Sequence, residues 1–148
     1  MAIKNYTTRV DVYTSLGEIQ GALAKNGACK LMIDYDGAGR PIGLMFAINS
    51  PINGMMLFSL PAQVDGVLAV FAKQKIKPDR AQAERTAWRN VRDWVLAQMA
   101  FIEAGNATLD EIFLPYLTKK QGETLYQMYT NKRLLLDEGG RADANGYR

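Results

Sequence analysis

The sequence contains no histidine and a single cysteine, Cys29, among its 148 residues. Without histidine the chain can form no Ser-His-Asp or Cys-His triad, no imidazole general base and no zinc site with a histidine ligand. A single cysteine excludes an internal disulfide, a four-cysteine metal site and a CxxC redox pair. These absences remove the commonest catalytic and metal-binding classes. We therefore expect a protein that is not an enzyme and that has no metal or cofactor.

Long apolar runs are missing as well. No stretch approaches the roughly 18 uninterrupted apolar residues that a membrane helix needs, and the N-terminal residues lack the apolar core of a secretory signal. The hydrophobic content of 48% and the charged content of 22% are typical of a globular domain. We expect a cytoplasmic protein without membrane contact.

The net charge of +3 is unevenly distributed along the chain. Residues 1–72 hold five basic and five acidic side chains, and residues 93–148 hold six basic and eight acidic ones. Residues 73–92 hold seven basic and two acidic side chains, a net charge of +5. All of the positive excess lies in this one segment, which points to an anionic ligand or partner.

The N-terminal part of the chain shows the patterns of short strands with one helix among them. Alternating apolar residues predict a strand over residues 7–13. Ser15 and Glu18 have the spacing of a capping box, so we expect a helix from Ser15 to Asn26-Gly27. Glycine- and asparagine-containing turns then separate three more predicted strands, which would form an antiparallel meander. These strands cover residues 30–35, 41–48 and 55–60.

From Pro61 onward the apolar spacing becomes helical. We predict four helical segments: residues 62–75, a long central helix from 79 or 80 to 104, a short turn from Thr108 to Phe113, and residues 123–134. The polar, glycine-bearing residues 139–148 are expected to form a flexible tail. The predicted fold is therefore one α+β domain over residues 1–138, sheet-rich over 4–60 and helical over 62–135.

The long predicted helix carries the strongest candidate for a binding site. Arg85, Arg89 and Arg92 have i, i+4, i+7 spacing and share one face beside Trp88. Three guanidiniums could grip phosphates while the indole stacks on a base, and Lys77 could extend the site. The alternative is a solvated basic face whose partners are neighbouring acidic groups. Both interpretations stay open from the sequence.

Several segments of this chain resemble a small-protein family common in phages and prophages, over about residues 4–130. A looser resemblance is architectural: a sheet followed by helices is similar to the plan of the phage Thoeris anti-defence proteins. Those proteins are non-enzymatic oligomers that sequester a cyclic ADP-ribose signal made by bacterial TIR-domain immunity proteins. The segments that carry the first resemblance are Asn5–Thr8, Ala22–Ala28, Ile33–Asp36, Leu60–Gly66, Glu84–Trp94 and Glu111–Leu117.

Residues and resemblance together predict a counter-defence protein in a host cell that sequesters an anionic, nucleotide-like ligand. Its ligand-binding residues would be Arg85, Trp88, Arg89, Arg92 and Lys77. The apolar long helix also suggests a homo-oligomer with the pocket between subunits. Two alternatives remain: a single-stranded nucleic-acid-binding accessory factor of phage replication or recombination, and an inhibitor that binds a CRISPR effector or another host defence nuclease.

Overall fold

In the computed structural model, which describes residues 1–118 and 122–131, three consecutive strands form an antiparallel meander. Two tight turns make the connections possible, because Gly39 (φ 80°) and Gly54 (φ 71°) adopt the left-handed conformation that glycine tolerates best. The predicted meander is therefore confirmed. The strands are β1 (Ala28–Tyr35), β2 (Pro41–Ser50) and β3 (Gly54–Pro61).

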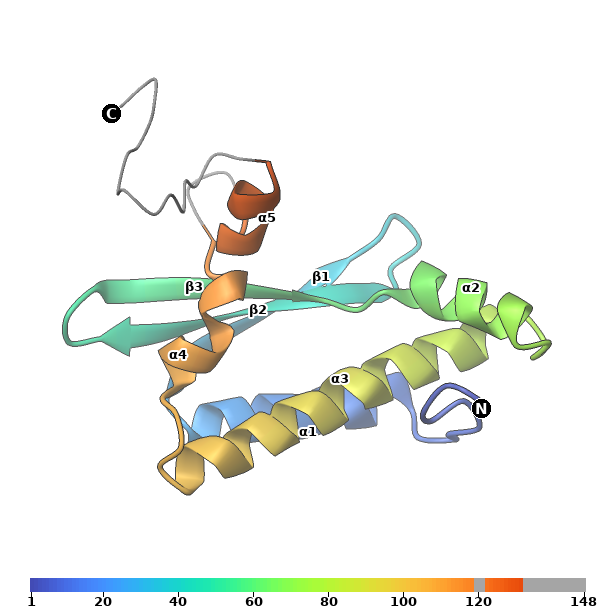
Figure 1. The fold of residues 1–148 in the computed structure, drawn as a ribbon, viewed down its shortest axis with the longest axis horizontal. Coiled ribbons are helices and arrows are strands. Elements are labelled where there is room, and N and C mark those ends of the chain that lie inside the picture. The colour runs from blue at the N-terminus through green and yellow to red at the C-terminus, as the bar shows by residue number, and fades with distance from the viewer. Residues whose placement is uncertain (119–121, 132–148) are drawn as a thin grey trace.

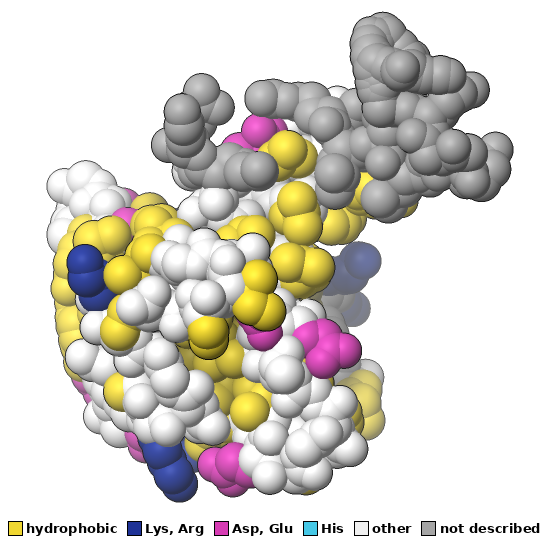
Figure 2. All heavy atoms as spheres, turned by 90° about the vertical axis from the view of Figure 1, so that its left-hand side faces the viewer, with side chains coloured by type: hydrophobic (Ala, Val, Ile, Leu, Met, Phe, Trp, Pro, Cys, Tyr) yellow, Lys and Arg dark blue, Asp and Glu magenta, His cyan; other side chains and the backbone are white. Residues whose placement is uncertain are grey.

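The two faces of this sheet differ in their surroundings. Leu44 and Phe46 of β2 point to the inner face and are paired with Leu60 and Phe58 of β3, and all four side chains are buried. The rings of Phe46 and Phe58 stack with centroids 5.1 Å apart. The opposite, outer face is partly open, since Met32 and Met55 on that face are exposed. Figure 2, which faces the end of the molecule at the β2–β3 turn, shows hydrophobic side chains at that surface. The core therefore lies on one side of the sheet.

The first helix, α1 (Val12–Lys25), begins earlier than the sequence predicts. Its N-cap is Asp11, whose carboxylate accepts a hydrogen bond from the Tyr13 amide at 2.9 Å. The predicted capping box at Ser15 is therefore wrong. The predicted strand over residues 7–13 is also wrong: residues 7–11 precede α1, and residues 12 and 13 form its first turn. The Thr8 carbonyl accepts from two side chains of a later helix, Gln82 and Arg85.

The predicted helices of the second half are confirmed as α2 (Val64–Lys73) and α3 (Arg80–Glu103). The segment between α2 and α3 ends at Asp79, the N-cap of α3, whose carboxylate accepts a hydrogen bond from the Ala81 amide at 3.0 Å. Helix α3 packs against α1, α2 and the short helix that follows it, so the prediction of a central long helix holds. Figure 1 shows α1 and α3 side by side beneath the sheet, with α2 at one end.

The chain then returns to the outer side of the sheet through α4 (Leu109–Phe113), η1 (Leu114–Tyr116) and α5 (Leu125–Thr130). Thr108 caps α4 as predicted, with a complete capping box. The Thr118 amide donates to the Leu57 carbonyl at 2.8 Å, so this segment lies along the outer edge of β3. Figure 1 shows α5 on the face opposite α1 and α3. The rest of the predicted helix 123–134 and the predicted tail 139–148 lie outside the described residues.

We predict that Asp11→Ala lowers the free energy of unfolding by about 1 kcal/mol, because the first turn of α1 loses its side-chain acceptor. Urea denaturation at pH 7 measures this change. Asp11→Asn is the matched control, since asparagine caps about as well as aspartate and should preserve most of the stability. An unchanged midpoint for Asp11→Ala would contradict a helix that begins at Val12.

Candidate functional site

The predicted arginine face lies against α1 and is occupied by a carboxylate of that helix. Arg89 Nη1 lies 3.1 Å from Glu18 Oε1, and Arg92 Nε lies 2.6 Å from the same oxygen. The hydrogen bond from Arg92 is the main cause that lowers the pKa of Glu18 below its ordinary value. One acidic side chain of α1 thus binds two of the three candidate arginines.

A second carboxylate, Asp93, joins the same arrangement. It accepts from Arg92 Nη1 at 2.9 Å and from Asn5 Nδ2 at 2.9 Å, and Lys4 Nζ lies 3.4 Å away. Burial raises the pKa of Asp93, but the hydrogen bonds from Asn5, Arg92 and Lys4 outweigh it and the net pKa is lowered. The ionised form of Asp93 therefore fastens the N-terminal segment to α3.

Other polar side chains of α3 bind the backbone of the N-terminal segment. Gln82 Nε2 donates to the carbonyls of Tyr6 and Thr8, each at 2.9 Å. Arg85 Nε donates to the Thr8 carbonyl at 3.4 Å, and the Thr86 hydroxyl donates to the Asn5 carbonyl at 3.0 Å. The backbone of the N-terminal segment is therefore hydrogen-bonded to side chains of α3 and not to a neighbouring strand.

The structure brings only some of the predicted site residues together. The arginines cluster as predicted, but Trp88 is 0% exposed and its indole N–H donates to the Pro41 carbonyl at 3.2 Å. A ring at this depth cannot stack on a ligand, so the predicted role of Trp88 is wrong. Lys77 is exposed and lies in the segment between α2 and α3, so it is not part of the helix that carries the arginines. The arrangement favours a structural role for this face.

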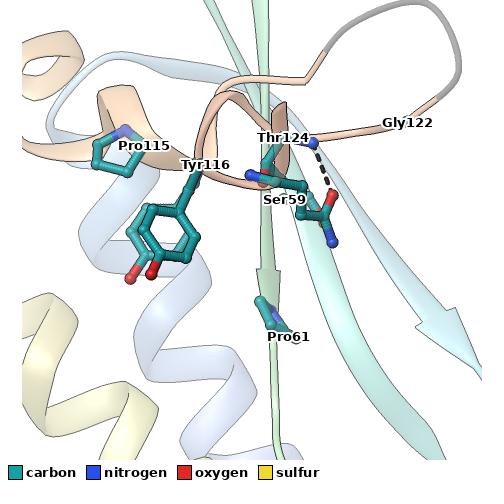
Figure 3. Close-up of a pocket in the computed structure, with 8 residues that line it drawn as sticks. Ser59, Pro61, Pro115, Tyr116, Gly122 and Thr124 are labelled. Carbon is teal, nitrogen blue, oxygen red and sulfur yellow. Dashed lines mark hydrogen bonds between the residues drawn. The ribbon is translucent and has the colours of Figure 1, made fainter. Parts of the chain in front are cut away.

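A cavity of about 350 Å³ lies on the other side of the sheet, between β3 and the C-terminal segment. We call it the aromatic pocket. Figure 3 shows Ser59 and Pro61 along β3, with Pro115 and Tyr116 on one side and Thr124 and Gly122 on the other. Its described lining consists of Ser59, Pro61, Pro115, Tyr116, Gly122, Thr124, Tyr126 and Gln127.

Local hydrogen bonds and ring contacts fix the walls of the aromatic pocket. Thr124 and Gln127 form a capping box at the start of α5, drawn in part as the dashed line of Figure 3. The Leu125 amide donates to the Leu117 carbonyl at 2.7 Å, which ties α5 to η1. The ring of Tyr116 lies 5.8 Å from that of Trp94 in an edge-to-face contact, so α3 supports this wall.

The described lining of the aromatic pocket carries aromatic rings and hydroxyl groups but no charged side chain. None of its eight described lining residues carries a carboxylate, amine, guanidinium or thiol group. The hydroxyls of Ser59, Tyr116 and Tyr126 make no hydrogen bond to any other described residue. They can therefore donate to or accept from a bound molecule. Rings for stacking and hydroxyls without a partner in the described part of the chain together suit a flat, polar, uncharged group.

The sequence does not single out any residue of the aromatic pocket. Its walls come from β3 and from residues 115–127, which are separated by more than fifty positions in the chain. Residues 115–127 do contain proline, two tyrosines, two threonines and two glutamines around Gly122. That composition is also typical of an ordinary turn and short helix. Only the contact with β3 turns it into a cavity.

Among residues 1–118 and 122–131, no group of three or more cysteine, aspartate and glutamate side chains is arranged to hold a metal ion. None of the helices described in these ranges has the length and hydrophobicity needed to cross a membrane.

We predict that the arginine face matters for stability in a pH-dependent way. The pKa of Glu18 is lowered below 4.5 in the folded state, so its carboxylate stabilises the fold above that pH and loses this effect as the pH falls. Glu18→Gln should therefore lower the melting temperature at pH 7, and its difference from the wild type should shrink below about pH 4. Thermal unfolding by circular dichroism at several pH values measures both.

Glu103→Gln is the matched control for this prediction. Glu103 lies 3.8 Å from Lys25 in an exposed ion pair, and such pairs contribute little. If both variants shift the melting temperature equally at pH 7, the account of Glu18 is wrong.

No model of a protein family, no curated protein and no solved structure matches this chain. The resemblance to phage proteins therefore stays a prediction, and the function has to be argued from the two sites themselves.

Proposed function

We propose that this chain is a non-catalytic binding protein whose aromatic pocket takes the ring of a nucleotide-like small molecule. The observation that carries the proposal is the lining of that pocket, where two tyrosine rings, Tyr116 and Tyr126, lie near hydroxyl groups that have no hydrogen-bond partner among the described residues. Purine and pyrimidine rings stack on tyrosine, and their edges carry donors and acceptors that hydroxyls can satisfy.

The size of the aromatic pocket supports a base or nucleoside as the part that enters it. Small-molecule sites commonly span roughly 300–1,000 Å³, and this cavity has about 350 Å³. A whole dinucleotide would therefore extend beyond the described walls. The remainder of a larger ligand, including any phosphate, would lie towards solvent.

The described lining has no carboxylate, amine, guanidinium or thiol group, which supports binding over catalysis. General acid–base catalysis needs a group that titrates near the working pH, and a hydroxyl nucleophile needs a neighbouring base. Apart from the phenols of Tyr116 and Tyr126, the eight described lining residues offer no side chain for the first role, and none of them is a carboxylate, histidine or lysine base for the second. Sequestration of an immune signal, which the looser architectural resemblance to the Thoeris anti-defence proteins implies, is compatible with such a site and is part of the proposal.

The arginine face is a weaker candidate for the ligand-binding site. Arg89 and Arg92 are engaged by Glu18, and Arg92 also binds Asp93. A phosphate would have to displace these carboxylates. Lys4, Arg85, Arg89 and Arg92 still outnumber the two carboxylates by two positive charges, which can attract anions to the surface without forming a site. The nucleic-acid alternative depends on this face and is weakened in the same way.

We predict that Tyr126→Ala weakens binding of a nucleoside about tenfold, because one stacked base loses roughly 1–3 kcal/mol without its aromatic partner. Isothermal titration calorimetry with adenosine, guanosine, cytidine and uridine, followed by their phosphates and ADP-ribose, measures the affinities. Tyr13→Ala is the matched control, since Tyr13 is similarly exposed (53% against 57%) and belongs to α1.

The comparison of each nucleoside with its monophosphate locates the site. Binding in the aromatic pocket predicts similar affinities for the two, because no described lining residue pairs with phosphate. No binding of any ligand in this panel would refute the proposal. So would tight binding of phosphates alone that Arg89→Ala abolishes and Tyr126→Ala leaves unchanged.

A further inference from the structure

Strand β1 forms an edge of the sheet that no other part of the described chain covers. The strand order is β1-β2-β3, and β1 is hydrogen-bonded to β2 on one side only. The outer edge of β3 is partly paired, since Phe58 forms a bridge with Leu117. Unpaired N–H and C=O groups along an edge strand are a template for another strand.

The side chains of β1 divide between the two faces of the sheet. Leu31 and Ile33 point to the inner face and pack against the core. Lys30, Met32 and Asp34 lie on the outer face, and Met32 is 56% exposed. On the outer face of this edge strand, the apolar Met32 therefore lies between a positive charge, Lys30, and a negative charge, Asp34.

This pattern is complementary to itself. When two copies of one strand pair antiparallel about a two-fold axis, the residue on the axis faces itself and its neighbours face each other crosswise. With Met32 on the axis, Lys30 of each copy lies opposite Asp34 of the other, and Leu31 lies opposite Ile33. The pairing gives two opposite-charge pairs on the outer face and extends the apolar inner face.

We propose that the protein forms a dimer in which the β1 strands of two copies pair antiparallel about Met32, joining their sheets into one of six strands. The occupant of the edge is a second copy, because only a strand with the same charges in reverse order matches Lys30 and Asp34 together.

Neighbouring registers do not offer this match. An axis through Leu31 places Lys30 opposite Met32, and an axis through Ile33 places Met32 opposite Asp34. Each leaves a charge facing an apolar side chain. Lysine on an edge strand usually prevents pairing with other strands. Here Asp34 removes that obstacle for the self-pair alone, so the same residues both allow the dimer and disfavour other partners.

The proposed dimer is independent of the proposed function. The aromatic pocket lies against β3, at the opposite edge of the sheet from β1. The sequence also suggests an oligomer, but through the long helix. In the structure that helix contacts α1, α2 and α4, whereas the outer edge of β1 pairs with no strand of the described chain.

Charge reversal tests the register. Sedimentation velocity from micromolar to hundreds of micromolar concentrations should show a monomer–dimer equilibrium for the wild type. Lys30→Asp and Asp34→Lys should each raise the dimer Kd about tenfold or more, because two attractive pairs become repulsive. The double variant Lys30→Asp/Asp34→Lys should restore dimerisation. Lys73→Asp, an equal charge change at the end of α2, should have no effect.

Two results would overturn the proposal: a wild type that stays monomeric at every concentration, or a double variant as weak as the single ones. Circular dichroism confirms that each variant is folded, which is expected because both side chains are exposed.

Cysteine substitution tests the position of the axis. In a Cys29→Ser background, Met32→Cys should form a disulfide-linked dimer on mild oxidation, since the two copies of residue 32 face each other within disulfide range. Lys30→Cys should not, because its two copies lie about 13–14 Å apart along the strands. Equal cross-linking of both variants, or of Lys30→Cys alone, would overturn the register.

Discussion

The sheet and the helical layer are joined at Trp88, on which the rest of the structure depends. Its ring is fully buried, and its indole N–H satisfies the Pro41 carbonyl at the start of β2. Further along α3, the ring of Trp94 packs edge-to-face against Phe113. Phe113 in turn packs against Phe46, on the inner face of the sheet. Through these rings α3 fixes both the meander and the returning C-terminal segment, and so the wall of the aromatic pocket.

The opposite side of α3 uses charged and polar side chains to bind α1 and the N-terminal segment. Its arginines bind Glu18 of α1 and Asp93, and its amide and hydroxyl side chains bind the N-terminal backbone. Half-buried ion pairs of this kind are costly to break because a remaining charge loses its partner. The basic face is therefore better understood as an attachment surface within the molecule. The proposed ligand site is the aromatic pocket beside β3, whose described lining is uncharged.

The sequence predicts most of the fold because each confirmed element carries its own local signal. The turns at Gly39 and Gly54 separate the strands, and Asp79 and Thr108 cap their helices. The start of α1 is not predictable in this way, because Asp11 and Ser15 are both good caps and only the contacts of the N-terminal segment with α3 decide between them. The depth of Trp88 and the aromatic pocket could not be predicted either, since both result from residues far apart in the chain.

The central claim is that ligand binding belongs to the aromatic pocket and not to the arginine face. The most direct measurement is a two-dimensional ¹H–¹⁵N NMR titration with a nucleoside monophosphate, which carries both a ring and a phosphate. The account predicts that the largest shifts fall on the amides of Gly122, Thr124 and Gln127, which line the pocket. Shifts confined to the amides of Arg85 to Arg92, with the pocket unchanged, would contradict it.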